Sequence, residues 1–395
     1  MPVDLSASIF AQYKRTRKRA EEAVRRGAAR EAATEYRRAA ELMRQYADYA
    51  RDASIKKQRK QRAESHDKMA LQLDGMPAQI GPAMRKDYLQ AAEPLAEADY
   101  ESEVMALIEE STIRWGDIAG LEETKQAIKA AFGLAVARKP KGVRIDSLRN
   151  ILFFGPPGTG KTLLAAAAAG NLDATFFNVE VDKLVSKYFG ESSKIISALY
   201  AVARRMSPSV VFLDDFESLT PPRGESESGA ERRIVSTFLV ALDGLATKDD
   251  KSYVLTIGAT NLPWTLDNAI LSRFQKYIYV PLPDAQARRT ILEIHLTKRG
   301  HKMAVPMDSL VRRTEKFSGR EIEKLCIEAI SSMTRRANPG LMAVVDRGQD
   351  ALRQYEIRIE PLTEADFQTA FDQIHPATDE RLIQRHQDWL KKAEA

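Results

Sequence analysis

The chain has almost no cysteine and no long apolar run. Cys326 is the only cysteine among 395 residues, which excludes an internal disulfide framework and favours a reducing compartment. No apolar segment approaches the ~18 residues of a membrane-spanning helix, and the first residues lack the pattern of a secretory signal. Because 44% of the residues are hydrophobic, we expect a soluble, cytoplasmic protein with large buried cores.

The net excess of positive charge lies at the start of the chain. Residues 1–80 hold 18 Lys and Arg against 11 Asp and Glu, a net +7, whereas the whole chain carries +5 and the remainder therefore −2. A chain of this length predicts two or three domains, at ~150 residues per domain. The basic excess therefore belongs to an N-terminal domain.

A glycine-rich segment follows the apolar run 151–154 and precedes a run of alanines. Its sequence from Gly155 to Thr162 has the spacing G-x-x-x-x-G-K-T. Between a buried strand and a helix, this spacing predicts a loop whose N–H groups and positive helix end hold phosphates. Lys161 is expected to reach the β- and γ-phosphates and Thr162 a Mg²⁺ ion. The candidate nucleotide-binding residues are Pro157, Gly158, Thr159, Gly160, Lys161, Thr162 and Leu163.

Strand and helix patterns alternate after Trp115, which predicts an α/β domain with a parallel sheet flanked by helices. After Pro283 only helices are expected, including one that begins with the capping box Ser318–Glu321. The expected strands are 151–154, 175–179, 210–213 and 254–257, and the expected helices include 162–170 and 232–242.

Residues 5–74 read as three short helices. Ala32, Tyr36, Ala39, Met43 and Ala47 form one apolar stripe. From 75 to about 112 the chain is rich in Gly and Pro and then acidic, which predicts a flexible linker, with a short helix possible at 104–108.

Two carboxylates end the apolar strand 210–213. In a phosphate-loop fold Asp214 would hold Mg²⁺ through water, and Asp215 would orient the attacking water. Asn261, at the end of the next strand, is a second polar candidate, although an Asn there also suits a turn before Pro263.

Further motifs occur in a fixed order with the glycine loop. They are Trp115–Leu121, Ser186–Ser192, Arg223–Glu227 and Gly258–Trp264. Together they resemble the meiotic clade of AAA ATPases, which holds katanin, spastin, fidgetin and the ESCRT-III-disassembling ATPases. The resemblance covers roughly 112–395, and the N-terminal pattern resembles an MIT domain. Tetratricopeptide hairpins, or a basic bundle that oligomerises or contacts nucleic acid, are alternatives for that part.

The resemblance implies roles for single residues. Asn261 would contact the γ-phosphate and the attacking water, and Arg273 would act as an arginine finger toward a neighbouring subunit. Ile118, Gly120, His295 and Gly319 would lie around the adenine and ribose, although packing explains them equally well. Lys187, Tyr188 and Phe189 would form a pore loop that grips a threaded peptide, and 223–233 a second pore loop.

Three departures from the family pattern stand out. Asp215 replaces the usual Glu, and a carboxylate withdrawn by about 1 Å can cost ~100-fold in rate. Ser272 replaces one of a run of arginines, so Arg273 is the remaining finger candidate. The segment 338–360 is too short for the β-insertion of eukaryotic ESCRT-III ATPases.

The resemblance implies domains at 1–75 (MIT-like), 76–111 (linker), 112–282 (large AAA domain) and 283–395 (small helical domain). It implies an ATP- and Mg²⁺-dependent hexameric ring that threads the tails of ESCRT-III-like filament subunits and so disassembles them. Microtubule severing or general unfolding, a nucleotide-gated scaffold with weak hydrolysis, and nucleic-acid remodelling are the alternatives.

Overall fold

The computed structural model describes residues 6–49, 53–86, 88, 100–101, 103–137, 148–187, 191–219, 229–244 and 252–393. The chain divides into two units, one of Met1–Leu107 with Lys194–Val202 and one of Ile108–Ser193 with Ala203–Ala395. Each unit is described below by itself. Among the described residues, no helix combines the length and the apolar character needed to cross a membrane.

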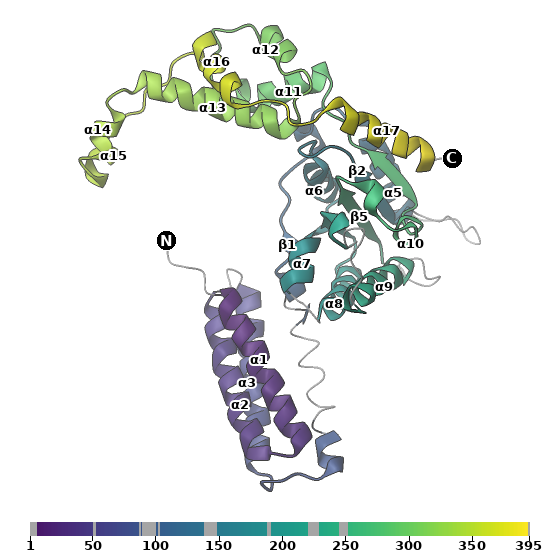
Figure 1. The fold of residues 1–395 in the computed structure, drawn as a ribbon. Helices are drawn as coiled ribbons and strands as arrows, with labels where there is room; N and C mark the ends of the chain where they lie inside the picture. Colours follow the sequence, from purple (N-terminus) through teal and green to yellow (C-terminus); the bar gives the residue numbers. More distant parts are fainter. Residues whose placement is uncertain are drawn as a thin grey trace. The chain divides into compact units, whose positions relative to one another are not determined.

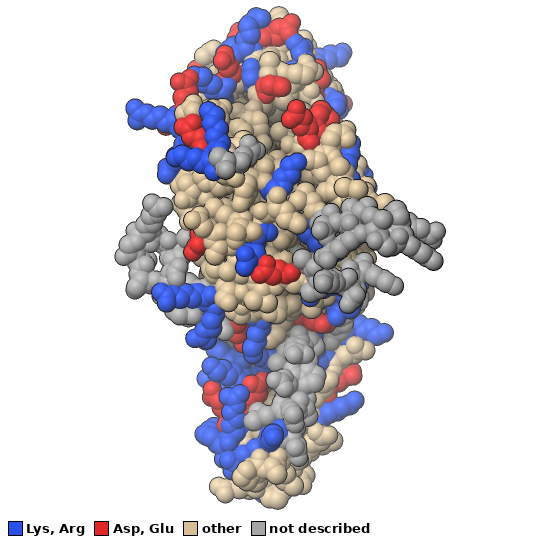
Figure 2. Space-filling model, turned by 90° about the vertical axis from the view of Figure 1, so that its right-hand side faces the viewer, with Lys and Arg blue, Asp and Glu red and all other residues tan. Residues whose placement is uncertain are grey.

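The N-terminal unit contains a bundle of three helices, α1 (Ser6–Arg26), α2 (Ala29–Asp48) and α3 (Ala53–Asp74) (Figure 1). The three helices are confirmed, but they are 20 to 22 residues long and not short. All five residues of the predicted stripe are buried; its three alanines let the helices approach closely, and Tyr36 and Met43 fill the space between them. Figure 2 shows Lys and Arg spread over this bundle with Asp and Glu between them.

The sheet of the second unit has six strands in the order β1-β3-β4-β5-β2-β6. The edge strand β1 is antiparallel to β3, and all other neighbours are parallel. The strands are β1 (Ile108–Glu109), β2 (Asn150–Phe154), β3 (Thr175–Glu180), β4 (Ser209–Asp214), β5 (Val254–Thr260) and β6 (Lys276–Tyr279). The parallel α/β fold is therefore confirmed, and the carboxyl ends of β2, β4 and β5 lie at one edge.

Helices surround this sheet, and three elements differ from the sequence-based expectation. The strand β1 stands at the end of the segment 104–108 expected to be helical, and β6 was not predicted. A short helix, α7, also separates β3 from the expected pore loop. The helices are α5 (Glu122–Val136), α6 (Lys161–Asn171), α7 (Val181–Lys187), α8 (Ser192–Arg205), α9 (Gly229–Gly244) and α10 (Asn268–Leu271), with 3₁₀ turns η1 (Trp115–Asp117), η2 (Phe216–Leu219) and η3 (Pro263–Thr265).

A helical part follows Pro283, as predicted. Its apolar core includes Leu292, Leu325 and Phe367, and the capping box of Ser318 and Glu321 is present at α13. Its elements are α11 (Ala285–His295), η4 (Thr297–Arg299), α12 (Met307–Arg313), α13 (Gly319–Ala337), α14 (Leu341–Val345), α15 (Gln349–Gln354) and α16 (Glu364–Gln373).

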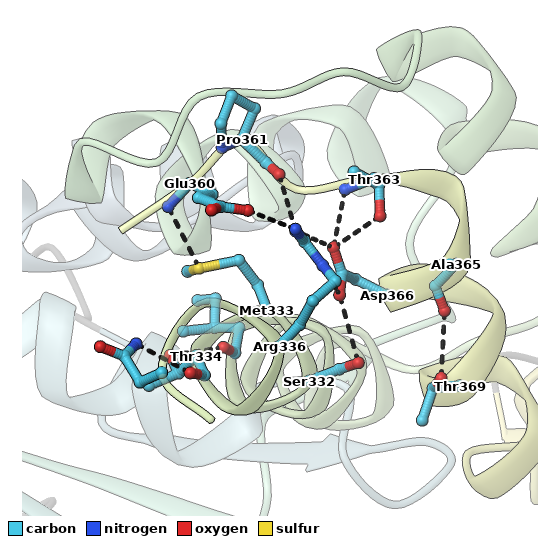
Figure 3. A network of polar contacts seen from close by, with 12 residues as sticks. Ser332, Met333, Thr334, Arg336, Glu360, Pro361, Thr363, Ala365, Asp366 and Thr369 are labelled. Atoms are coloured by element: carbon cyan, nitrogen blue, oxygen red, sulfur yellow. Dashed lines mark hydrogen bonds and ion pairs between the residues drawn. The ribbon is translucent and has the colours of Figure 1, made fainter. Parts of the chain in front are cut away.

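A buried carboxylate joins α13 to α16 in this helical part. Asp366 accepts hydrogen bonds from the backbone N–H and the hydroxyl of Thr363 and from Arg336 and Ser332 (Figure 3). Burial alone would raise the pKa of Asp366, but the hydrogen bonds from Arg336 and Thr363 outweigh it and lower that pKa. The last helix, α17 (Glu380–Ala393), returns to the sheet and contacts β6 and η3.

Candidate nucleotide-binding and active site

The predicted phosphate loop connects β2 to α6, as the sequence indicated. Two of its glycines are required by conformation and by space. Gly155 has φ +151°, and a Cβ there would lie 2.2 Å from the carbonyl oxygen of Val280. Gly158 has φ +76°, and its Cβ would lie 2.8 Å from Oγ of Ser318. The loop is thus pressed between β6 and the start of α13, and only glycine fits at these positions.

Lys161 is buried at the first position of α6. Its Nζ donates to the carbonyls of Gly155 and Pro156, both at 2.9 Å, and to Oδ1 of Asn261 at 2.8 Å. Burial lowers the pKa of Lys161 to about 8, an effect that Asp214, Glu217 and Asp215 oppose. The three oxygen atoms therefore hold the ammonium group beside the loop, in a position to bind an anion.

The two predicted magnesium ligands lie together. The hydroxyl of Thr162 donates to Oδ2 of Asp214 at 3.0 Å. Mg²⁺ prefers hard oxygen ligands and keeps several waters, so one hydroxyl and one carboxylate beside a phosphate site fit this ion. No cluster of three or more His, Cys, Asp or Glu able to hold a metal occurs among the described residues.

Asp215 follows directly on β4 and is exposed. Its φ of +50° lies in the left-handed region, which aspartate, like asparagine, adopts more readily than other non-glycine residues. Burial raises the pKa of its carboxyl, and Asp214, Glu217 and Asp182 add to that effect. Burial and the neighbouring carboxylates therefore make Asp215 a stronger proton acceptor than an ordinary aspartate.

Asn261 lies at the end of β5 with its side chain on Lys161. Its backbone N–H donates to Oε1 of Glu217 at 3.1 Å. Glu217 was not predicted as a site residue, although its position two residues after Asp215 is a signal in the sequence. Its second oxygen, Oε2, is buried and has no hydrogen-bond partner in the part of the chain that the structure describes.

The small helical part adds a second cation to this edge of the sheet. The backbone N–H of Arg320 donates to the carbonyl of Gly158 at 3.1 Å. The charge of its side chain contributes to lowering the pKa of Lys161, so the two cations lie near each other. The sequence of this segment indicated a capping box, and Arg320 was not predicted as a site residue.

The predicted adenine and ribose residues are only partly brought together. A Cβ on Gly319 would lie 3.4 Å from the carbonyl of Gly158, and one on Gly120 3.4 Å from Cβ of Ala287. The carbonyl of Ile118 accepts from Lys125 at 2.7 Å.

His295 lies at the end of α11, and its Nδ1 is 3.9 Å from Oε1 of Glu323. Burial lowers the pKa of its imidazole, which Glu323 opposes. Its polar neighbour, Glu323, thus lies on α13, and among the described residues no hydrogen bond or ion pair joins His295 to the phosphate loop. Pro157 and Leu163 are exposed on the loop and on the first turn of α6.

Arg273 follows α10, away from the phosphate loop of its own chain. Its Nε lies 2.7 Å from Oδ1 of Asp243 on α9, and its Nη1 donates to the hydroxyl of Ser272 at 3.1 Å. The side chain of Asn150 on β2 donates to the backbone carbonyl of Arg273 at 3.0 Å. The finger candidate is thus partly exposed, paired with an acid of its own chain and held at its backbone.

The predicted pore residues fall largely outside the described part of the chain. Lys187 is the last residue of α7. Tyr188, Phe189 and residues 223–228 of the second loop lie outside the described residues.

Comparison with known proteins identifies the large domain. The model of the family described as "ATPase family associated with various cellular activities (AAA)" matches residues 151–282. Spastin of Naegleria gruberi is 36% identical over 289 residues, which are 72% of this chain and 53% of that protein. Human vacuolar protein sorting-associated protein 4A is 42% identical over 235 residues, 58% of this chain and 53% of that protein. The chain spans about half the length of the curated relatives it matches.

Solved structures agree with these matches. The crystal structure of the FIGL-1 AAA domain is 32% identical and has a TM-score of 0.61, and the match covers 74% of this chain and 95% of that one. The N-terminal three-helix bundle fits the MIT-like pattern expected from the sequence. The family model, these relatives and this solved structure together show that the chain belongs to the AAA ATPase family, among the relatives of spastin, katanin, fidgetin and vacuolar protein sorting-associated protein 4.

Proposed function

We propose that this chain forms an ATP-hydrolysing ring of six copies, the number that the family resemblance implies. The ring disassembles a protein polymer of the ESCRT-III type by pulling a subunit tail through its pore. One observation carries the catalytic part of the proposal. Lys161 and Thr162, at the start of α6, are each hydrogen-bonded to a residue at the end of a neighbouring strand, Lys161 to Asn261 after β5 and Thr162 to Asp214 of β4.

Each residue of this group has a task in the proposed reaction. Lys161 binds the β- and γ-phosphates, and Thr162 and Asp214 would hold Mg²⁺, which neutralises charge on the phosphates. Asp215 orients the attacking water and draws its proton, and Asn261 fixes the water and the γ-phosphate. Arg273 of a neighbouring copy stabilises the charge of the transition state, a contribution that can reach 10³–10⁵ in rate.

The N-terminal bundle supplies the proposed link to the polymer. It is basic, as the composition of residues 1–80 shows, and MIT domains receive helical tails of partner proteins. Tyr188 and Phe189 then grip the tail in the pore, since an aromatic ring offers a large apolar contact. The sequence gives this part of the proposal its support.

A filament-disassembly assay tests the proposal against microtubule severing. The full chain is mixed with preformed ESCRT-III-like filaments or with microtubules, and polymer is pelleted with ATP or with a non-hydrolysable analogue. We expect ATP-dependent loss of the ESCRT-III-like filaments alone, and none with Lys161→Ala. Loss of microtubules alone would move the proposal to severing.

Asp215 favours a second candidate, a nucleotide-gated scaffold. Its side chain is one methylene shorter than that of the family residue, which withdraws the carboxylate from the attacking water and favours slow hydrolysis. Such a scaffold would bind filaments in its ATP form and release them at the rate of hydrolysis. In the pelleting assay it would co-sediment with intact filaments in ATP and leave them without shortening them.

A further inference from the structure

The last helix, α17, is seated on the sheet by aromatic contacts. The guanidinium of Arg385 lies 3.9 Å from the ring centroid of Trp264 in η3. The ring of Trp389 lies 4.7 Å from that of Phe154 on β2 and 5.4 Å from that of Tyr277 on β6. These contacts fix the position of α17 over the end of the strand that leads into the phosphate loop.

His386 lies at the centre of this seat and is 0% exposed. Its ring centroid is 5.0 Å from that of Trp264, 6.1 Å from Tyr279 and 6.3 Å from Phe154. A histidine in an aromatic cage loses its hydration, so its ring nitrogens need hydrogen-bond partners within the protein.

Both nitrogens of His386 have a carbonyl partner. Nδ1 lies 2.8 Å from the oxygen of Leu382, one turn earlier in the same helix. Nε2 lies 3.0 Å from the backbone oxygen of Asn261, which is 125 residues away in the sequence. Burial lowers the pKa of His386, which favours the neutral ring with a single N–H. Because a carbonyl oxygen can only accept, His386 donates to Asn261 in the tautomer that carries this proton on Nε2.

The backbone of Asn261 is therefore held on both sides. Its N–H donates to Glu217 and its carbonyl accepts from His386, while its side chain accepts from Lys161. Two fixed peptide groups determine the direction in which the side chain leaves the backbone. The Cβ atom of Asn261 is consequently held at a fixed place from which the amide can meet a phosphate.

We propose that His386 is a positioning residue for ATP hydrolysis, which acts by holding the backbone of Asn261 from α17 while Glu217 holds it from the opposite side. This inference rests on the proposed role of Asn261 at the γ-phosphate and the attacking water. A displacement of about 1 Å at such a group costs up to ~100-fold in rate. The hold therefore affects kcat, and ATP binding depends on the phosphate loop itself.

Two amide substitutions distinguish the contact of Nε2 with Asn261 from the contact of Nδ1 with Leu382. The amide nitrogen of His386→Gln reaches the place of Nε2, so it still donates to Asn261. The amide nitrogen of His386→Asn reaches the place of Nδ1 and donates only within α17. With the full chain fully assembled, we expect His386→Asn to lower kcat about 10- to 100-fold with KM for ATP nearly unchanged, and His386→Gln to restore most of that loss. Equal kcat for the two variants would overturn the proposal.

Control variants distinguish positioning from stability. Trp389→Phe weakens the seat of α17 without touching the polar contact, so its melting temperature should fall while its kcat stays within about twofold of wild type. A loss of kcat in Trp389→Phe as large as in His386→Asn would show that α17 is only structural. Glu217→Met removes the opposite hold without touching α17, and an unchanged kcat there would also refute the proposal.

A double-mutant cycle separates this inference from the role on which it rests. Asn261→Ala should lower kcat strongly, and adding His386→Asn to it should lower kcat no further, since coupled residues are not additive. If Asn261→Ala keeps wild-type kcat, the proposed role of Asn261 is wrong. If Asn261→Ala is impaired and the two substitutions multiply, Asn261 keeps its role and His386 does not act through it.

Discussion

Lys161 donates a 2.8 Å hydrogen bond to Oδ1 of Asn261, and this contact joins the start of α6 to the end of β5. The three donor positions of the ammonium group are all used, because Gly155 and Pro156 accept the other two hydrogen bonds. A triphosphate that binds Lys161 must therefore replace at least one of these acceptors. If the triphosphate replaces Asn261 as the acceptor of Lys161, the amide side chain of Asn261 becomes free to contact the γ-phosphate.

ATP affinity should depend on pH through Lys161. Burial lowers its pKa from the model-compound value of 10.5 to about 8, so the free protein loses this charge as the pH rises above 8. We expect the affinity for ATP, measured by calorimetry, to fall about tenfold per pH unit above 8. Lys161→Arg keeps its charge and should bind with little change over this range, and Lys161→Ala should not bind. Constant wild-type affinity up to pH 10 would contradict the prediction.

Restoring the family residue at position 215 should raise turnover. Asp215→Glu extends the carboxylate by one methylene, and we expect kcat about 10- to 100-fold higher with ATP binding unchanged. Because the pKa of Asp215 is raised, wild-type kcat should fall on acidification at a higher pH than an ordinary aspartate would cause. An unchanged or lower rate in the variant, measured by phosphate release, would mean that the site is arranged around the shorter acid.

The local parts of the site were predictable from the sequence. The strand, loop and helix around Lys161 and the carboxylates after β4 follow from patterns within a few residues, where spacing alone sets geometry. The family order of motifs then identified Asn261 and Arg273 as site residues, and the structure places Asn261 on Lys161. Their roles remain predictions.

The contacts between distant segments were not predictable in the same way. Asn261 is 100 residues from Lys161 and 125 from His386, and no spacing rule connects them. The edge strand β1 has only two residues, and β6 begins with a charged residue, so neither has a clear strand pattern. Arg320 was hidden by the capping box beside it, which explains the same residues by local structure.

The buried carboxylate of Asp366 should be a main contributor to the stability of the small helical part. Asp366→Ala leaves the donors of Thr363 unpaired and takes from Arg336 one of its two acidic partners, the other being Glu360. We expect a loss of roughly 2–4 kcal/mol in denaturant unfolding. Its pKa is lowered in the folded state, so this contribution is present at neutral pH and is lost as the pH falls through the folded value. The exposed Asp372 on the same helix accepts only from Gln368 in the described structure. Asp372→Ala should cost no more than about 0.5 kcal/mol, and equal losses would contradict a special role for Asp366.

Tyr188 should act in gripping the threaded chain and not in ATP hydrolysis. Its sequence position is far from every proposed phosphate contact, and an aromatic ring provides the apolar area that grips a chain. Tyr188→Ala should keep basal ATPase while partner-stimulated ATPase and filament disassembly fall. Phe189→Ala is the matched comparison within the loop. Wild-type disassembly by Tyr188→Ala would refute threading through this loop, and an unfolded variant would place the side chain in a core.

Catalysis should be shared between copies through Arg273. Specific activity should rise steeply with protein concentration, and Arg273→Ala should bind ATP but lose about 10³-fold or more in kcat. Its partner Asp243 is half exposed, and such pairs contribute only about 0–1 kcal/mol, so Asp243→Ala should change kcat by less than about fivefold.

A mixing experiment tests sharing directly. Lys161→Ala chains cannot bind ATP but still offer Arg273, whereas Arg273→Ala chains bind ATP but lack the finger. Because each supplies what the other lacks, their mixture should hydrolyse ATP although neither variant does so alone. A mixture no more active than the sum of its parts, at a concentration where the chains co-assemble, would mean that Arg273 serves its own chain or none.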